Sequence, residues 1–290
     1  MTTPDTKQTS KCKGIIKLCR PRHWVKNSFI IAPLIFTLGD ASLVTLVSLT
    51  IALVSFCATC SCIYALNDCL DVENDRLHPT KRFERPIASS LISRNLGFRV
   101  SLLLGAIGLA VSLCVNSSVF FLVALYISIN LAYSIILKNV PYIELMCIVS
   151  GFVIRILIGA SALMVPVTMW IILTTVMISL FLISMKRRQE MINTDRSARG
   201  VLKHYHIKEM TLIALASCAG TVATYLLYLM QTKIDASGIV ALTVLVSIGL
   251  IRYWKITQEN PDESSPVSLI TKDTTLIAIV IAWLLISLIA

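Results

Sequence analysis

The apolar run LVTLVSLTIALVSFCATCSCIYAL, residues 43–66, is followed by the charged run NDCLDVENDRLHPTKRFERP at residues 67–86. The first part carries no charged residue and exceeds the roughly 20 residues that cross the ~30 Å hydrocarbon core of a bilayer as a helix. The second part opens with an asparagine and an aspartate. The sequence therefore predicts a membrane-spanning helix with an acidic cluster at its end.

Apolar runs of this kind recur along the chain. Hydrophobic residues make up 56% of the 290 residues and charged residues 14%, whereas soluble domains are about one-quarter charged. Lipid offers the backbone no hydrogen-bond partners, and no run alternates as barrel strands do, so the spanning elements should be helices. We predict an all-α polytopic membrane protein, a bundle of nine transmembrane helices at residues 24–40, 43–66, 97–115, 118–137, 140–163, 166–185, 210–230, 236–253 and 274–290.

The basic residues predict the orientation of this bundle. Of the 26 Lys and Arg, all but Arg155 and Lys233 fall near the N-terminus or near the connections after the second, fourth, sixth and eighth predicted helices. By the positive-inside rule those parts are cytoplasmic. We expect residues 1–23 to form a basic cytoplasmic segment and residues 24–290 one intramembrane domain, in the inner or plasma membrane with its active-site loops on the cytoplasmic face.

The net charge of +10 does not require a nucleic-acid partner, because basic residues that border helices are attracted to anionic lipid. The nine cysteines include three in CATCSC, residues 57–62, inside a predicted helix. Thiols in such a place usually pack as small groups, so we predict reduced, structural cysteines.

Four oxygen-bearing side chains follow the apolar run. If the helix continues past residue 66, Asp68, Asp71 and Asp75 share one helical face, with Asn67 beside them. Carboxylates on one face repel each other unless a cation neutralises them, and hard oxygen ligands suit Mg²⁺ that bridges to substrate phosphates. We predict that these four residues bind Mg²⁺. The alternative is a solvated acidic patch whose members pair with neighbouring bases.

Basic side chains flank the acidic cluster. Arginine offers a planar pair of donors that matches phosphate, and lysine a compact charge. The predicted donors to substrate phosphates in this region are Arg22, Lys26, Lys81 and Arg82. Acids that hold a metal beside bases that hold phosphate predict a diphosphate-binding site.

A second charged segment, KRRQE at residues 186–190, ends the sixth predicted helix. Lys186 and Glu190 are four residues apart, so they form either a helix-stabilising pair or, with Arg187, a wall of the phosphate site. Among the expected reacting-site residues, Lys186 joins the three aspartates.

The stretch YSIILKNVPYIELM, residues 133–146, contributes further candidates. Tyr133 is a candidate for substrate binding, and Lys138 is either a topology signal or a phosphate donor. Glu144 and Arg155 are about three turns apart on one helical face. Charges at membrane depth face a cavity or each other, so both are candidates for a substrate cavity, with structural pairing as the alternative.

These residues resemble the UbiA superfamily of intramembrane prenyltransferases. NDCLDVENDRLHP, residues 67–79, is similar to the NDxxDxxxD element of that family, and YSIILK, residues 133–138, to its YxxxxK element. The resemblance is strongest to the decaprenyl-phosphate phosphoribosyltransferase branch, through RPRHWVKN, DRLHPTKRFERPIAS, GFVIRILIGA and KRRQE, which start at residues 20, 75, 151 and 186. It implies transfer of 5-phosphoribose from phosphoribosyl pyrophosphate to a polyprenyl phosphate.

Other functions stay open from the sequence. An aromatic or quinone-precursor prenyltransferase would use the same metal to ionise a prenyl diphosphate, and should line its cavity with aromatic residues. A transporter should distribute polar residues through several helices, whereas here they collect at one end. A homo-oligomer is compatible with the sequence, which does not determine the chain length of the lipid.

Overall fold

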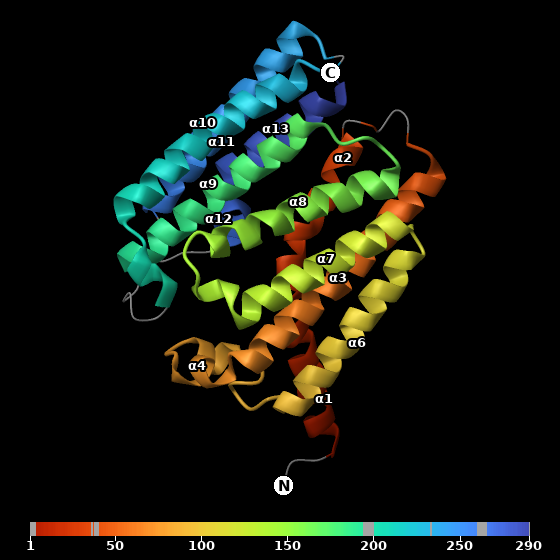
Figure 1. Cartoon of the computed structure of the whole chain (residues 1–290), viewed down its shortest axis with the longest axis vertical. Helices are drawn as coiled ribbons and strands as arrows, with labels where there is room; N and C mark the ends of the chain where they lie inside the picture. Colours follow the sequence, from red (N-terminus) through yellow and green to blue (C-terminus); the bar gives the residue numbers. More distant parts are fainter. Residues whose placement is uncertain are drawn as a thin grey trace.

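The computed structural model describes residues 4–35, 37, 41–193, 200–232, 234–259 and 266–289. Every regular element within those ranges is helical (Figure 1). Seven of the described helices are long and apolar enough to cross a membrane: α3 (Leu43–Leu70), α6 (Arg94–Leu113), α7 (Ser117–Ile135), α8 (Ile143–Leu163), α9 (Met169–Asn193), α10 (Ile207–Leu229) and α11 (Ala236–Glu259). The all-α membrane architecture is confirmed, and the number nine is not.

The predicted helix at residues 24–40 is replaced by two shorter elements. They are the 3-10 helix η1 (Pro21–Ile30) and the short α2 (Ala32–Ile35), while residues 36 and 38–40 lie outside the described residues. The 3-10 helix η1 has 10 residues and α2 has 4, so neither is long enough to span lipid. The last predicted helix is α13 (Thr274–Ile289), whose 16 residues also fall short of that length.

The remaining described elements are short or lie at the ends of the bundle: α1 (Pro4–Cys19), α4 (Val72–Leu77), α5 (Lys81–Glu84), η3 (Leu137–Asn139), η5 (Gly200–His204) and α12 (Pro266–Lys272). In Figure 1, α3, α6 and α7 form one side of the molecule, and α9, α10, α11 and α13 form the other. Helix α8 packs on both α7 and α9, so it joins the two sides.

Small residues let α3 and α6 approach each other closely. The buried face of α6 consists of Gly97, Ser101, Gly105, Gly108 and Ser112. A Cβ atom at Gly108 would lie 2.3 Å from Thr59 Oγ1, and Ser55 Oγ donates to the Gly108 carbonyl at 2.7 Å. Such stripes drive helix association in lipid, where no hydrophobic effect operates between apolar surfaces. The contact fixes the helix whose end carries the acidic residues.

Helix α3 continues beyond the apolar run, as the acidic pattern required, but it ends at Leu70 with Asp71 as its C-cap residue. Ser42 caps its first turn by accepting from the Thr45 amide at 3.2 Å. Asp71 has φ −93° and ψ 7°, and α4 starts at the next residue. The expected single helical face is therefore divided: Asp68 lies in the last turn of α3, Asp71 at the junction and Asp75 on α4.

Candidate active site at the end of helix α3

Asp68 is the centre of the acidic cluster. Its side chain is 1% exposed, and its Oδ1 atom accepts from Arg20 Nη2 and from Arg85 Nη1, the latter at 3.3 Å. Its Oδ2 atom is buried and has no hydrogen-bond partner among the described residues. A buried carboxylate oxygen without a donor is costly, so this oxygen is available to a cation.

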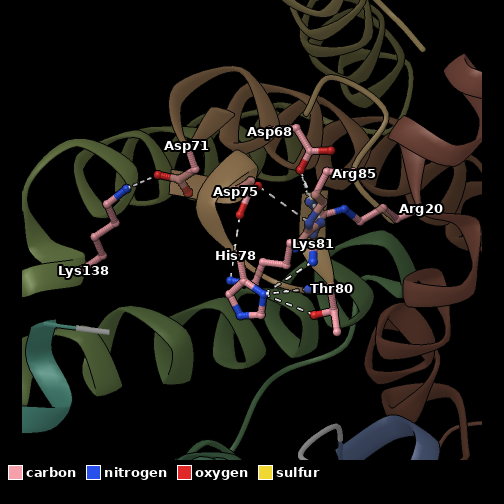
Figure 2. A network of polar contacts seen from close by, with 9 residues as sticks. All are labelled: Arg20, Asp68, Asp71, Asp75, His78, Thr80, Lys81, Arg85 and Lys138. Atoms are coloured by element: carbon pink, nitrogen blue, oxygen red, sulfur yellow. Dashed lines mark hydrogen bonds and ion pairs between the residues drawn. The ribbon is translucent and has the colours of Figure 1, made fainter. Parts of the chain in front are cut away.

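The other two aspartates also face bases, as Figure 2 shows. Lys138 Nζ donates to Asp71 Oδ1 at 2.5 Å. Asp75 lies near two bases, with Lys81 Nζ at 3.9 Å from Oδ1 and Arg85 Nε at 3.8 Å from Oδ2. Burial raises the pKa of Asp75 above its ordinary value. Charge neutralisation here comes from arginine and lysine side chains.

Asn67 takes part in a contact between α3 and α7. Its Oδ1 atom accepts from Ser134 Oγ, which also donates to the Asn130 carbonyl at 2.7 Å. Tyr133 precedes Ser134 on α7. The structure therefore brings the NDxxD segment and the YxxxxK segment together, through Ser134 and Asn67 and through Lys138 and Asp71.

The two arginines on Asp68 were absent from the predicted site. Arg20 has φ 50° and ψ 58°, a left-handed conformation that is uncommon without glycine. Its guanidinium lies 5.0 Å from the centre of the Tyr64 ring, one turn before Asp68 on α3. Such a conformation persists where the surrounding contacts hold it. Sequence offered one signal for Arg20, its place in RPRHWVKN, and one for Arg85, its place among the bases after the acidic run.

The predicted bases differ in their surroundings. Lys81 and Lys138 contact the aspartates, whereas Arg22 is exposed on η1 and Lys26 is half-buried there. The guanidinium of Arg82 stacks over the Phe83 ring at 4.5 Å. Neither Arg22 nor Arg82 forms an ion pair with an acidic residue within the described ranges.

The second charged segment forms a buried ion cluster. Arg187 is 1% exposed; its Nε and Nη2 atoms donate to Glu144 Oε1 and Oε2 at 2.6 and 2.7 Å. Its Nη1 atom donates to Glu190 Oε2 at 2.5 Å, and Lys186 Nζ lies 3.7 Å from Glu190 Oε1. Tyr205 donates from its hydroxyl to Glu144 at 3.3 Å, and burial raises its pKa to about 12.

These contacts involve residues that the sequence predicted for the site. Glu144 is ion-paired, but with Arg187 and not with Arg155. Lys186 and Glu190 do form the i, i+4 pair. The charge of Lys186 also reaches η1, where it contributes, after burial and two other bases, to lowering the pKa of His23 to about 4.

These positions differ in how well they could hold a metal ion. No group of three His, Cys, Asp or Glu side chains within the described residues is placed to hold a metal ion, because each aspartate turns to a base. The donor chemistry fits nonetheless. Asp68 Oδ2 is an unpartnered buried oxygen, and the neighbouring ligands are carboxylate and amide oxygens, which magnesium prefers.

A bundle of apolar helices with carboxylates and bases gathered at one end of a helix fits an integral membrane transferase. Residues 28–271 match the UbiA prenyltransferase family, and the chain belongs to that family.

Individual relatives are similar over most of the chain. The decaprenyl-phosphate phosphoribosyltransferase of Mycolicibacterium smegmatis is 30% identical over 290 residues, which cover 93% of this chain and 90% of the relative. The nodulation protein NoeC of Azorhizobium caulinodans is 29% identical and covers 81% of this chain and 78% of the relative. The resemblance inferred from the sequence motifs is confirmed.

A solved structure shares the fold. The UbiA homolog from Archaeoglobus fulgidus bound to GPP and Mg²⁺ aligns with a TM-score of 0.73 over 96% of this chain and 100% of that chain. The two sequences are 19% identical, so the likeness establishes the fold.

Proposed function

We propose that this membrane transferase moves 5-phosphoribose from phosphoribosyl pyrophosphate to a polyprenyl phosphate and releases pyrophosphate. The observation that carries the proposal is the 30% identity, along 93% of the chain, to a decaprenyl-phosphate phosphoribosyltransferase. The mixture of acids and bases at the end of α3 supports it, because both substrates are phosphate anions.

In this proposal, Asn67, Asp68, Asp71 and Asp75 hold Mg²⁺. The ion would neutralise the charge that builds on the departing pyrophosphate. Asp68 supplies the oxygen that lacks a donor, Oδ2. We propose Lys186 as a further residue of the reacting site, because its charge lies near enough to η1 to help lower the pKa of His23.

Each aspartate is ion-paired with at least one basic side chain that could itself bind phosphate. Arg20 and Arg85 bind Asp68, and Lys138 binds Asp71. Once a cation satisfies the carboxylates, these bases can donate to phosphate oxygens without leaving any charge unpaired. The proposed substrate contacts also include Arg22, Lys26, Lys81, Arg82 and Tyr133.

We propose a supporting role for the buried cluster around Arg187. The guanidinium of Arg187 makes three described contacts with Glu144 and Glu190 and points away from solvent. We assign Glu144, Arg187 and Glu190 to the wall that supports Lys186 at the substrate cavity. A phosphate acceptor is ionised at neutral pH, so positioning by this wall replaces the need for a strong protein base.

The membrane placement follows from the same charges. We propose that the basic ends of the bundle lie on the cytoplasmic face, where a water-soluble sugar phosphate is accessible, while the isoprenoid tail stays between helices and lipid. Oligomerisation has no assigned part in this mechanism.

The deciding experiment supplies the proposed donor and acceptor to the purified protein. Radiolabelled phosphoribosyl pyrophosphate, Mg²⁺ and polyprenyl phosphate should yield a labelled lipid, and chelation of the metal should abolish it. Absence of labelled lipid under conditions where the protein is folded would contradict the proposal.

A second candidate is prenyl transfer from a polyprenyl diphosphate to an aromatic or quinone-precursor acceptor. Its support is the shared fold with the homolog bound to GPP and Mg²⁺. The same assay with a labelled prenyl diphosphate and an aromatic acid distinguishes the two, because only one pair of substrates should give product.

A further inference from the structure

Arg155 lies in the middle of α8, inside the bundle, with 5% of its surface exposed. The acceptors of its N–H groups are neutral. Nε donates to Asn27 Oδ1 at 3.1 Å, Nη1 to the Gly151 carbonyl at 2.7 Å and Nη2 to Cys60 Sγ at 3.5 Å. A guanidinium at membrane depth costs several kcal/mol, so the fold retains it for the contacts that it makes.

Aromatic rings complete the surroundings of this guanidinium. The centres of three rings lie 4.8 to 5.4 Å from its central carbon, those of Phe56, Tyr126 and Phe152. Their faces stabilise a cation without pairing it with an anion. The result is a rigid polar hub that joins α8 to α3, α7 and η1.

Asn27 is the residue of η1 that bonds to Arg155 in the hub. It is 1% exposed, and both ends of its side-chain amide bond to thiols. Cys60 Sγ donates to Oδ1 at 3.5 Å, and Nδ2 donates to Cys57 Sγ at 3.2 Å. The CATCSC stretch therefore supplies weakly polar partners to an amide inside the membrane. All nine cysteines are free thiols in the structure.

The thiols belong to a longer stripe of α3 that faces η1. Ser61 Oγ accepts from Trp24 Nε1 and donates to the Cys19 carbonyl, both at 3.0 Å. One turn further, Tyr64 lies under Arg20, and one more turn leads to Asp68. Residues three and four apart share a helix face, so the stripe leads from the hub to the acidic cluster.

The backbone of η1 at Ile30 packs against α8 at Gly159, one turn after Arg155. A Cβ atom at position 159 would lie 1.9 Å from the Ile30 carbonyl oxygen. Asn27 and Ile30 are three residues apart, the period of a 3-10 helix, so both point to α8. Side-chain bonding at Arg155 and close backbone contact at Gly159 thus fix the rotation and the height of η1.

We infer that Arg155 and Asn27 are positioning residues, which anchor η1 between α3 and α8 and thereby hold Arg20 against Asp68 at the candidate active site. Neither residue touches the acidic cluster. The anchoring is independent of which substrate the site takes, and its consequence for turnover rests on the proposed function.

The first test is the accessibility of η1 to trypsin in detergent-solubilised full-length protein. Cleavage after Lys26 requires η1 to detach, because the next residue is Asn27. Three variants separate anchoring from folding: Asn27→Leu removes the amide at similar volume, Asn27→Asp keeps an acceptor for Arg155, and Arg155→Met removes the buried charge. Ser101→Ala is the matched control, since Ser101 bonds α6 to the Cys62 carbonyl away from η1.

Asn27→Leu and Arg155→Met should release the fragment that begins at residue 27 about tenfold faster or more, since each loses the Arg155 bond. Asn27→Asp and Ser101→Ala should be cut at the rate of the original protein. Arg155→Met removes a desolvation cost, so its unfolding temperature should stay level or rise. A purely structural part would lower that temperature instead. Equal cleavage rates for Asn27→Leu and the original protein would overturn the inference.

The second test measures turnover with phosphoribosyl pyrophosphate. Asn27→Leu should lower kcat/KM about tenfold, and combining it with Arg20→Gln should add little to the loss from Arg20→Gln alone, because both act through one group. Additive losses would contradict action through Arg20. If the original protein transfers no phosphoribose, the proposed function fails while the trypsin result still decides the anchoring.

Discussion

At the scale of single residues, the two carboxylate oxygens of Asp68 have different surroundings. The side chain is buried, one oxygen accepts from two arginines, and the other oxygen has no donor in the described structure. A carboxylate arranged for stability alone would satisfy both oxygens. The unsatisfied oxygen supports the proposed part of Asp68 in binding a cation.

Replacing Asp68 with asparagine should therefore separate function from stability. We expect a loss of turnover of about 100-fold or more, because the amide cannot supply the charge that a cation requires. The free energy of unfolding should change by only about 1 kcal/mol, since Arg20 and Arg85 are partly exposed and can turn to solvent. Glu73→Gln, on an exposed pair with Arg76, is the control for both measurements. Near-normal turnover in Asp68→Asn would contradict the metal assignment.

His23 gives the protein a sensitivity to acid. Burial and the nearby charges of Lys26, Arg20 and Lys186 lower its pKa from 6.5 to about 4. The unfolded chain then binds a proton at a higher pH than the folded one, so stability is lost as pH falls from about 6.5 toward 4.

The prediction for His23 is a difference between unfolding temperatures at about pH 7.5 and about pH 5. His23→Gln should show a smaller drop over this interval than the original protein. His204→Gln, at an exposed position, should show the same drop as the original protein. An unchanged drop in His23→Gln would mean that other groups control the acid sensitivity.

At the scale of elements, α8 and α9 are joined by the buried pair of Glu144 and Arg187. Glu144 is 0% exposed and Arg187 1% exposed, and both guanidinium edges are engaged. Removing one member of such a pair leaves a buried charge without a partner, whereas replacing both with apolar residues is often neutral.

A double-mutant cycle tests this coupling. Arg187→Met and Glu144→Leu alone should each destabilise the protein by about 3–5 kcal/mol, and the double variant should recover most of that loss. Arg252→Gln, which removes a part-exposed pair with Asp273 between α11 and the start of α13, should cost about 1 kcal/mol or less. The measurement is thermal unfolding in detergent. Equal effects of Arg187→Met and Arg252→Gln would refute the buried coupling.

At the scale of the whole molecule, two exposed cysteines report the orientation. Cys12 lies on α1 near the basic N-terminus, and Cys114 follows α6 at the opposite end of that helix from Arg94. If the basic ends are cytoplasmic, Cys114 should react with a membrane-impermeant maleimide on intact cells and Cys12 only after lysis. Cys12→Ser and Cys114→Ser identify each labelled site. Labelling of Cys12 on intact cells would reverse the proposed orientation.

Much of the architecture was predictable because its causes are local. Eight of the nine predicted segments coincide with helices, since apolar length and helical period are properties of consecutive residues. The exception, residues 24–40, failed because η1 is held by Asn27 and Gly159 contacts that no local pattern contains. The acidic spacing likewise predicted the cluster but not the break at Asp71.

The helical membrane bundle and the charged side chains after residue 66 follow from consecutive residues alone, because insertion into lipid depends on the apolar length of each segment. The partner of each charged side chain, in contrast, is set by the three-dimensional arrangement of the helices. Arg20 reaches Asp68 across 48 positions, Arg187 reaches Glu144 across 43, and Arg155 reaches Asn27 across 128. Such pairings depend on how the helices cross and how their connections run, so the partner of a charged residue cannot be read from its neighbours in the sequence.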